Sequence, residues 1–344
     1  MMTRILKISF WIFSILLVVA LALAILFVLP VKPEKNENVK LGLTFSTRAS
    51  EFLGLDWKKN YLDILNEINP EIIRIPVYWD RLEPTEGEYN WSDFDFQMEQ
   101  LEGRRTQAIL VVGIKLPRWP ECHQPEWIDE YVDSADIQGV SVAEDKLFKM
   151  IQAVVNRYKD HPNLYSWQVE NELLFPFGEC PEWVGNRNRL KREIAIVREA
   201  DDNHPVMTSD SGELSTWART ATLPIDVLGS SLYTTVYNEK NGYSYWPVNP
   251  YFYKFHIASV KPLVDEVIIS ELQLEPWGPD VLNNLEFDEI YKSFSPHNFD
   301  EKIDFAQRTG ASTVLGWGAE WWYYMKEKRD FPDYWQKAVE YMSE

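Results

Sequence analysis

Two carboxylates in this sequence stand where short, largely apolar stretches end, and such a pair can perform acid–base and nucleophilic chemistry. Glu172 closes the partly alternating stretch Trp167-Gln168-Val169-Glu170-Asn171-Glu172. Glu271 closes a second stretch that begins near residue 266. Buried strand ends seldom carry a carboxylate unless it has a partner or a function. We therefore treat Glu172 and Glu271 as a candidate catalytic pair.

A regular scaffold must position these carboxylates, and the rest of the chain supplies one. After about residue 40, strand-like apolar stretches alternate with helical stretches. We expect strands at residues 41–46, 72–79, 107–114, 163–172, 205–210, 227–234, 266–272 and 312–317. We expect helices at residues 56–68, 92–102, 141–158, 186–200, 213–220, 251–260, 299–309 and 333–342. Asp56 is the expected cap of the first helix, and Ser141 with Glu144 fits a capping box.

This alternation predicts an α/β fold, a (β/α)8 TIM barrel over residues 40–344. An open doubly wound sheet is the alternative, but it usually has fewer strands and would be expected with a nucleotide-binding fingerprint. Functional residues of a barrel lie at the carboxyl ends of its strands. The fourth and seventh expected strands would therefore direct Glu172 and Glu271 toward each other across the barrel mouth.

Other strand ends carry residues that can support such a pair. Arg74 lies on the second expected strand, where its charge would keep one carboxylate ionised. Tyr233, at the end of the sixth, can donate a hydrogen bond to the same group. Glycoside cleavage needs two carboxyl groups: one protonates the leaving oxygen, and the other attacks or activates water. The strand ends therefore predict a glycosidase.

The set of strand-end residues resembles the retaining glycoside hydrolases of clan A, and most nearly the cellulase-like family 5. The resemblance covers roughly residues 40–344 and rests on strand order as well as residue type. The positions that carry it are Asn171-Glu172, Glu271, Arg74, Tyr233 and Trp317. Ser231 departs from family 5, whose sixth strands commonly carry a histidine two residues before the tyrosine. This departure weakens the assignment to family 5 but not to the clan.

The resemblance implies a role for each matching residue. Glu172 would be the acid/base and Glu271 the nucleophile of a double displacement. Asn171 would bind the sugar 2-hydroxyl, while Tyr233 and Arg74 would position Glu271. Trp317 would be a stacking platform for the sugar ring, although Trp321 or Trp322 could take that place.

Several neighbouring residues are weaker candidates for the site. Glu170 shares a side with Glu172 but would sit deeper, and Glu275 follows Glu271 in an expected loop, where it could touch substrate. Three further side chains are expected to form walls of the sugar-binding cleft. These are Trp79, Trp119 and His123.

Composition narrows the set of partners. The formal net charge is −19, which argues against nucleic acid because phosphate binding needs clustered Lys and Arg. No metal-ligand spacing and no glycine-rich phosphate loop is present, so we expect neither a metal nor a cofactor. The 15 tryptophans suit stacking on apolar sugar faces as well as a large core.

The N-terminus predicts a single transmembrane helix. Residues 8–29 are apolar apart from two serines, long enough to span a hydrocarbon core of about 30 Å. A cleaved signal peptide is the alternative, but it usually has a shorter apolar core and a small-x-small site. Arg4 and Lys7 would stay in the cytoplasm, so the barrel would face outward. We expect an anchor at 1–30, a linker at 31–39, and a single-pass protein of the cell membrane.

Cys122 and Cys180 fall in the expected loops after the third and fourth strands. Neighbouring strands bring neighbouring loops within reach, so a disulfide is expected if the domain lies outside the cytoplasm. Two free thiols are the alternative. The leading hypothesis is thus a membrane-tethered, retaining β-glycoside hydrolase that cleaves a poly- or oligosaccharide. The alternative is a non-catalytic, membrane-tethered glycan-binding barrel, which would need no carboxylate pair.

Overall fold

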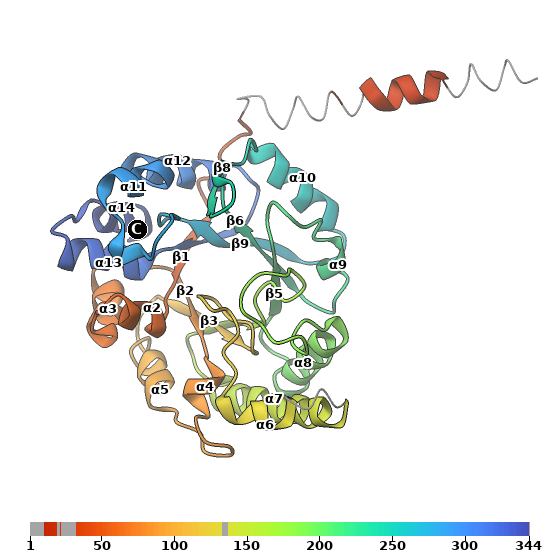
Figure 1. The fold of residues 1–344 in the computed structure, drawn as a ribbon, viewed down its shortest axis with the longest axis vertical. Coiled ribbons are helices and arrows are strands. Elements are labelled where there is room, and N and C mark those ends of the chain that lie inside the picture. Colours follow the sequence, from red (N-terminus) through yellow and green to blue (C-terminus); the bar gives the residue numbers. More distant parts are fainter. Residues whose placement is uncertain (1–9, 19–20, 22–31, 133–136, 344) are drawn as a thin grey trace, which may run out of the picture.

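A closed parallel barrel surrounded by helices makes up the body of the protein (Figure 1). The computed structural model describes residues 10–18, 21, 32–132 and 137–343. Within these residues, eight strands close in the order β1-β10-β9-β6-β5-β4-β3-β2. They are β1 (Lys40–Thr44), β2 (Ile72–Pro76), β3 (Gln107–Val112), β4 (Leu164–Val169), β5 (Val206–Asp210), β6 (Val227–Leu232), β9 (Glu266–Gln273) and β10 (Thr313–Trp317). The predicted TIM barrel is therefore confirmed.

Helices lie outside the strands and carry the chain from one strand to the next. Among the helices that the structure describes, the longest is α7 (Ile137–Tyr158), and α8 (Arg187–Ala200) comes next along the chain. The others are α2 (Thr47–Phe52), α3 (Trp57–Asp63), α4 (Trp79–Leu82), α5 (Ser92–Glu99), α6 (Asp129–Val132), α9 (Ala218–Ala221), α10 (Pro250–Val260), α11 (Phe287–Ser293), α12 (Pro296–Gln307), α13 (Ala319–Lys328) and α14 (Asp333–Met342).

Capping residues explain where some helices begin, and one predicted cap is wrong. Asp56 caps α3, since its side chain accepts hydrogen bonds from the backbone of Lys58 and Lys59. Asn186 caps α8 in the same way. The helix predicted to start at Ser141 instead begins at Ile137, so Ser141 lies inside it and is not its cap.

The interior of the barrel changes from apolar to polar toward the carboxyl ends of the strands. Ile72, Met207 and Ile268 belong to a small apolar cluster separate from the main core between strands and helices. Side chains two residues apart on a strand point the same way. Arg74 therefore follows Ile72 on the interior face of β2, and Ser270 likewise follows Ile268 on β9. The barrel thus has a packed apolar floor and a polar upper layer.

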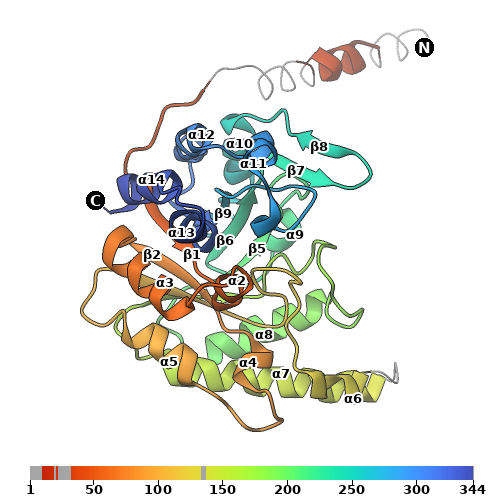
Figure 2. The same cartoon turned by 60° about the vertical axis from the view of Figure 1, so that its left-hand side comes forward.

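Two segments in the loops were not expected from the sequence. A hairpin of β7 (Thr235–Asn238) and β8 (Gly242–Tyr245) follows β6 and projects away from the barrel (Figure 2). Helix α11 lies between the seventh and eighth barrel strands, where the sequence predicted only one helix, at residues 299–309. The hairpin follows the carboxyl end of β6, which is the end of the barrel where a site is expected.

Among the described residues, no helix is both long and apolar enough to cross a membrane. The predicted transmembrane helix, residues 8–29, lies largely outside the described residues. Only residues 10–18 and 21 of that stretch are described, and they are helical.

Candidate active site

A cavity of about 930 Å³ opens at the carboxyl end of the barrel. The segments that follow β1, β3, β4, β5, β6 and β9, together with the end of β10, supply its lining. Both candidate catalytic carboxylates, Glu172 and Glu271, line it. The size suits a cleft that encloses one or a few sugar rings.

Glu271 is the carboxylate that other side chains hold in place. It lies on β9 and is 5% exposed. Its Oε1 accepts a hydrogen bond from Arg74 Nη1 at 3.0 Å, and its Oε2 accepts one from Tyr233 Oη at 3.1 Å. The three residues predicted to meet here are therefore together. Two donors, one of them a cation, fix the orientation of the carboxylate and leave it able to act as a nucleophile.

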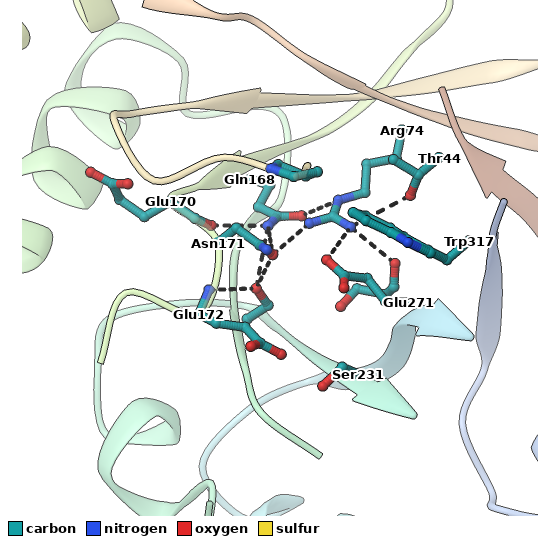
Figure 3. A network of polar contacts seen from close by, with 12 residues as sticks. Thr44, Arg74, Gln168, Glu170, Asn171, Glu172, Ser231, Glu271 and Trp317 are labelled. Atoms are coloured by element: carbon teal, nitrogen blue, oxygen red, sulfur yellow. Dashed lines mark hydrogen bonds and ion pairs between the residues drawn. The ribbon is translucent and has the colours of Figure 1, made fainter. Parts of the chain in front are cut away.

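Arg74 joins three strands of the barrel through a single guanidinium group. It is fully buried. Its Nη1 also reaches the Ser270 carbonyl at 3.1 Å, its Nε donates to Gln168 Oε1 at 2.8 Å, and its Nη2 donates to Asn171 Oδ1 at 2.6 Å (Figure 3). A planar guanidinium can serve all of these acceptors at once, whereas a lysine cannot. Arg74 therefore sets the geometry of the whole floor of the cavity.

Glu172 has the properties of a general acid. It lies beyond the end of β4, in the left-handed backbone region with φ 47°, and its N–H donates to Ser209 Oγ at 3.0 Å. Burial raises the pKa of Glu172 to about 8, with a further contribution from the charge of Glu271, while a hydrogen bond with Ser231 opposes the shift. The carboxyl is consequently protonated at neutral pH, as a proton donor to a leaving group must be.

The two rival carboxylates have other partners. Glu170 is fully buried and accepts hydrogen bonds from the backbone of Ile114 and Lys115 at 3.1 and 2.6 Å. Figure 3 shows its side chain directed away from the Arg74 cluster, and it does not line the cavity. Glu275 does line the cavity, where its Oε1 accepts from Arg118 Nη1 at 2.6 Å. Glu170 thus braces the loop after β3, and Glu275 belongs to the cavity wall.

Two of the predicted tryptophan side chains lie at the cavity. Trp317, at the end of β10, is 7% exposed, and its Nε1 donates to Glu275 Oε1 at 2.8 Å. The Arg118 guanidinium lies 4.1 Å from the centre of the Trp317 ring. Trp119 is 60% exposed on the cavity rim, where its ring meets that of Phe177 at a centroid distance of 6.1 Å.

The predictions for Trp79 and His123 are wrong, since neither residue lines the cavity. Trp79 starts α4, is fully buried, and donates its Nε1 to Glu83 Oε2 at 2.7 Å. His123 is 2% exposed, and its Nε2 lies 3.0 Å from the Arg118 carbonyl. Burial lowers the pKa of His123 to about 3, so it is neutral. Both side chains stabilise the loops behind the cavity wall.

The structure also brings residues to the cavity that the sequence did not single out for a role there. Glu121, Arg118 and Ser231 line it. Burial raises the pKa of Glu121 to about 8, with the charge of Glu271 as the second cause. The sequence did contain a clue that Glu121 reaches the cavity, because this acid directly precedes Cys122 in a loop that was already expected at the site. Ser231 had been noted only as a departure from a histidine.

A disulfide joins Cys122 and Cys180, the two cysteines placed by the sequence in neighbouring loops. It links the segment after β3 to the segment after β4, which carries Glu172. The backbone adds a second link, because Glu179 N–H donates to the Pro120 carbonyl at 2.9 Å. In the described part of the chain, no group of three or more His, Cys, Asp and Glu side chains is arranged to hold a metal ion.

Comparisons with known proteins relate the chain to glycoside hydrolases. Residues 56–182 match the profile of glycoside hydrolase family 42, described as β-galactosidase. A β-galactosidase of an Arthrobacter species is 26% identical over 123 residues, which are 33% of this chain and 18% of that protein. The β-galactosidase BgaA of Clostridium cellulovorans is 22% identical over 182 residues, 47% of this chain and 26% of that protein. The chain thus spans about a quarter or less of these relatives.

Solved structures share the fold. A β-galactosidase of the psychrophilic Marinomonas ef1 superimposes with a TM-score of 0.56 at 15% identity, covering 81% of this chain and 53% of that one. Xylanase 10B of Thermotoga maritima superimposes with a TM-score of 0.53 at 16% identity, covering 81% and 83%. The matches confirm the resemblance to the glycoside hydrolases of clan A and agree with a glycosidase. They do not point to family 5.

Proposed function

We propose that the barrel is a retaining β-glycosidase, with Glu271 as nucleophile and Glu172 as acid/base. One observation carries this proposal: two carboxyl groups line the same cavity in contrasting surroundings, one paired with a cation and the other buried beside a second acid. Glu271 is paired with Arg74 at 3.0 Å, whereas burial raises the pKa of Glu172 to about 8. A nucleophile must be ionised and an acid must hold a proton, and the two environments separate the groups accordingly.

The geometry suggests how each step proceeds. In the first step, a Glu271 oxygen attacks the anomeric carbon, the bond to the leaving oxygen breaks, and that oxygen takes the proton of Glu172. In the second step, the ionised Glu172 takes a proton from water, the water oxygen bonds to the anomeric carbon, and the bond to Glu271 breaks. Both carboxyl groups return to their starting states, and no cofactor enters either step.

The relatives suggest which substrates to try first. Those similar in sequence are named β-galactosidases, and one structural neighbour is a glycoside hydrolase family 10 endo-β-1,4-xylanase. We therefore propose a β-linked sugar of the galactose or xylose type, within an oligosaccharide or polysaccharide. The aromatic side chains on the cavity rim, including Trp119 and Phe177, suit contacts with further sugar rings.

Hydrolysis of a panel of 4-nitrophenyl β-glycosides by the full chain in detergent tests the proposal. We expect turnover of at least one sugar, and the first anomer seen by NMR should keep the β configuration. Glu271→Gln should lose at least about a thousandfold in kcat. Glu179→Gln, an exposed acid in the loop after β4, is the matched control. A folded Glu271→Gln variant with ordinary turnover would refute the assignment, and glycan binding without turnover would favour the binding-barrel alternative.

We propose further that the domain faces the outside of the cell membrane. The apolar stretch 8–29 behind Arg4 and Lys7 supports an outward orientation. The Cys122–Cys180 disulfide supports an oxidising compartment. Protease added to intact cells should digest the barrel, and deletion of residues 1–30 should release it from the membrane fraction. A barrel protected in intact cells would contradict this location.

A further inference from the structure

Glu121 is a third carboxyl group in the cavity, and the proposed reaction does not use it. It lies in the loop after β3, is 7% exposed, and lines the same cavity as Glu172 and Glu271. A carboxyl group buried to this degree is uncommon unless it is paired or has a function. Its position beside the two reacting groups therefore requires an explanation.

The loop that carries Glu121 is fixed by several contacts. The Glu121 N–H donates to the Arg118 carbonyl, and the Glu121 carbonyl accepts from Leu116 N–H, each at 2.8 Å. The next residue, Cys122, forms the disulfide with Cys180. Gly178 closes the other side, because a Cβ at that position would lie only 2.6 Å from the Glu121 Cβ. The carboxyl group therefore has a set position relative to the loop that follows Glu172.

The backbone at Glu121 is strained. Its φ is 78°, in the left-handed region that residues with a side chain seldom adopt. Glu172 shares this feature with φ 47°. Such conformations cost free energy and persist where the surrounding structure imposes them, often at functional sites. The chain maintains this strain at two of the carboxylates that line the cavity.

The electrostatic partners of Glu121 place it beside both reacting groups. Burial raises the pKa of Glu121 to about 8 and the charge of Glu271 adds to this, while Lys115, a hydrogen bond with Asn171 and the charge of Arg74 oppose it. In turn, the charge of Glu121 contributes to the raised pKa of Glu172. Glu121 is therefore within electrostatic reach of both groups.

Asn171 provides the direct link between Glu121 and the floor of the cavity. Its Oδ1 accepts hydrogen bonds from Arg74 Nη2 at 2.6 Å and from Ser209 Oγ at 2.7 Å. With its oxygen engaged in this way, the amide NH2 is the part left to donate to Glu121. Asn171 directly precedes Glu172, and Arg74 holds Glu271. Glu121 therefore belongs to the same polar cluster of the cavity as the two reacting carboxylates.

We propose that Glu121 binds the 2-hydroxyl of the sugar ring whose anomeric carbon lies between Glu172 and Glu271, the hydroxyl that the resemblance already assigns to Asn171. This inference rests on the proposed function. The anomeric carbon has two ring neighbours. One is the ring oxygen, which can only accept a hydrogen bond and gains positive charge in the oxocarbenium-like transition state, so a donor placed there would oppose the reaction. The other is C2, whose hydroxyl can donate to Glu121 while it accepts from Asn171. Hydrogen bonds to the 2-hydroxyl strengthen in the transition state of glycoside cleavage.

The proposal defines a substrate class. A site built to hydrogen-bond a hydroxyl rejects an analogue that lacks it, because its buried polar groups are left without a partner. Because the Glu121 loop is held by the disulfide and by Gly178, it cannot retreat from a larger group at C2. The site therefore selects sugars with a free 2-hydroxyl and excludes 2-acetamido sugars.

The test compares kcat/KM for the best 4-nitrophenyl β-glycoside with kcat/KM for its 2-deoxy and 6-deoxy analogues. The ratio between the parent glycoside and the 2-deoxy analogue is the readout, measured in the full chain and its variants. Glu121→Leu should reduce this ratio at least about tenfold, because the lost hydrogen bond affects only the parent. Glu121→Gln, which has the same shape, should reduce it less, by about threefold. Glu179→Gln, the exposed control, should not change it.

The outcomes separate this inference from the proposed function. If Glu121→Leu slows the parent and the 2-deoxy analogue equally, the inference is wrong although the protein is a glycosidase. The inference is also wrong if Glu121→Leu changes the kcat/KM ratio between the parent and the 6-deoxy analogue and leaves the ratio between the parent and the 2-deoxy analogue unchanged. If Glu121→Leu does not fold, the Glu121→Gln ratios decide in the same way. If the wild-type protein cleaves no glycoside of the panel, the proposed function fails, and the inference fails with it.

Discussion

Removing the Ser231 hydroxyl should move the alkaline limb of the pH–rate profile to higher pH. Ser231 Oγ accepts a hydrogen bond from Gly212 N–H at 3.0 Å, which leaves its own proton for Glu172. Burial raises the pKa of Glu172 to about 8, with the charge of Glu271 as the second cause. The hydrogen bond from Ser231 stabilises the ionised carboxylate and so lowers this pKa. Ser231→Ala removes that favourable contact and so raises the pKa of Glu172 further.

The magnitude follows from the value of one hydrogen bond to a charged group. Such a bond contributes about 1.5–3 kcal/mol. One pKa unit corresponds to about 1.4 kcal/mol, so the loss is equivalent to about 1–2 units. Water from the cavity can replace part of the lost contact, so a shift of about one unit is expected. Because the acid must be protonated, kcat/KM falls as pH rises through this pKa, and the variant should stay active to about pH 9.

A second variant should move the same limb in the opposite direction. The charge of Glu121 raises the pKa of Glu172, so Glu121→Gln should lower it and shift the limb to lower pH. Glu121 itself titrates with a pKa of about 8, so its charge is only partly present there. The shift should therefore be less than about one unit.

The assay measures kcat/KM from about pH 5 to 10 with an alkyl β-glycoside, a poor leaving group that depends on protonation. An alkaline limb that stays in place in Ser231→Ala would refute the assignment of Glu172 as the proton donor. Displacement of the limb in the same direction by Ser231→Ala and Glu121→Gln would also refute it, since the two contacts act on the Glu172 pKa with opposite sign.

Four further predictions concern other parts of the site. Glu172→Ala should slow alkyl glycosides far more than aryl glycosides with good leaving groups, and equal losses in kcat/KM would argue against its acid role. Arg74→Met leaves Glu271 buried without its cation, which should cost about 3–5 kcal/mol and lower the Tm by roughly 5–8 °C in calorimetry. Cys122→Ser opens a covalent link between residues 58 apart in the chain, which should cost up to about 4 kcal/mol in denaturant unfolding. Because the pKa values of Glu121 and Glu172 are raised to about 8, the folded state keeps protons that the unfolded state loses above about pH 5. The Tm should therefore fall between about pH 5 and 8, and the Tm of Glu121→Gln should fall less steeply.

The barrel and its central residues were predictable because they follow from local patterns. Strand-like stretches alternate with helical stretches, and this fixed the fold class. Glu271 and Arg74 sit on strands, so the fold alone brings them to the same layer of the barrel interior. Glu172 sits just past β4 and needed only the rule that sites lie at carboxyl ends.

Residues in loops were harder to place, because loop paths depend on contacts between segments far apart in the chain. Trp79 and His123 were predicted as cleft walls, but the chain turns into α4 and into a tight loop that bury them. Glu121 was missed for the converse reason. It reaches the cavity because the Cys122 disulfide and Gly178 hold its loop there, and residue type alone does not encode that path.

Covalent trapping is the measurement that tests the central claim most directly. The full chain is incubated with 2-deoxy-2-fluoro β-glycosides carrying good leaving groups, and the intact protein and its peptides are weighed. The account predicts an adduct of one sugar on Glu271, which accumulates because the electron-withdrawing fluorine slows both steps while the good leaving group keeps the first step measurable. An adduct on another carboxylate would contradict the account. So would the absence of any adduct from a protein that hydrolyses the matching glycoside with retention.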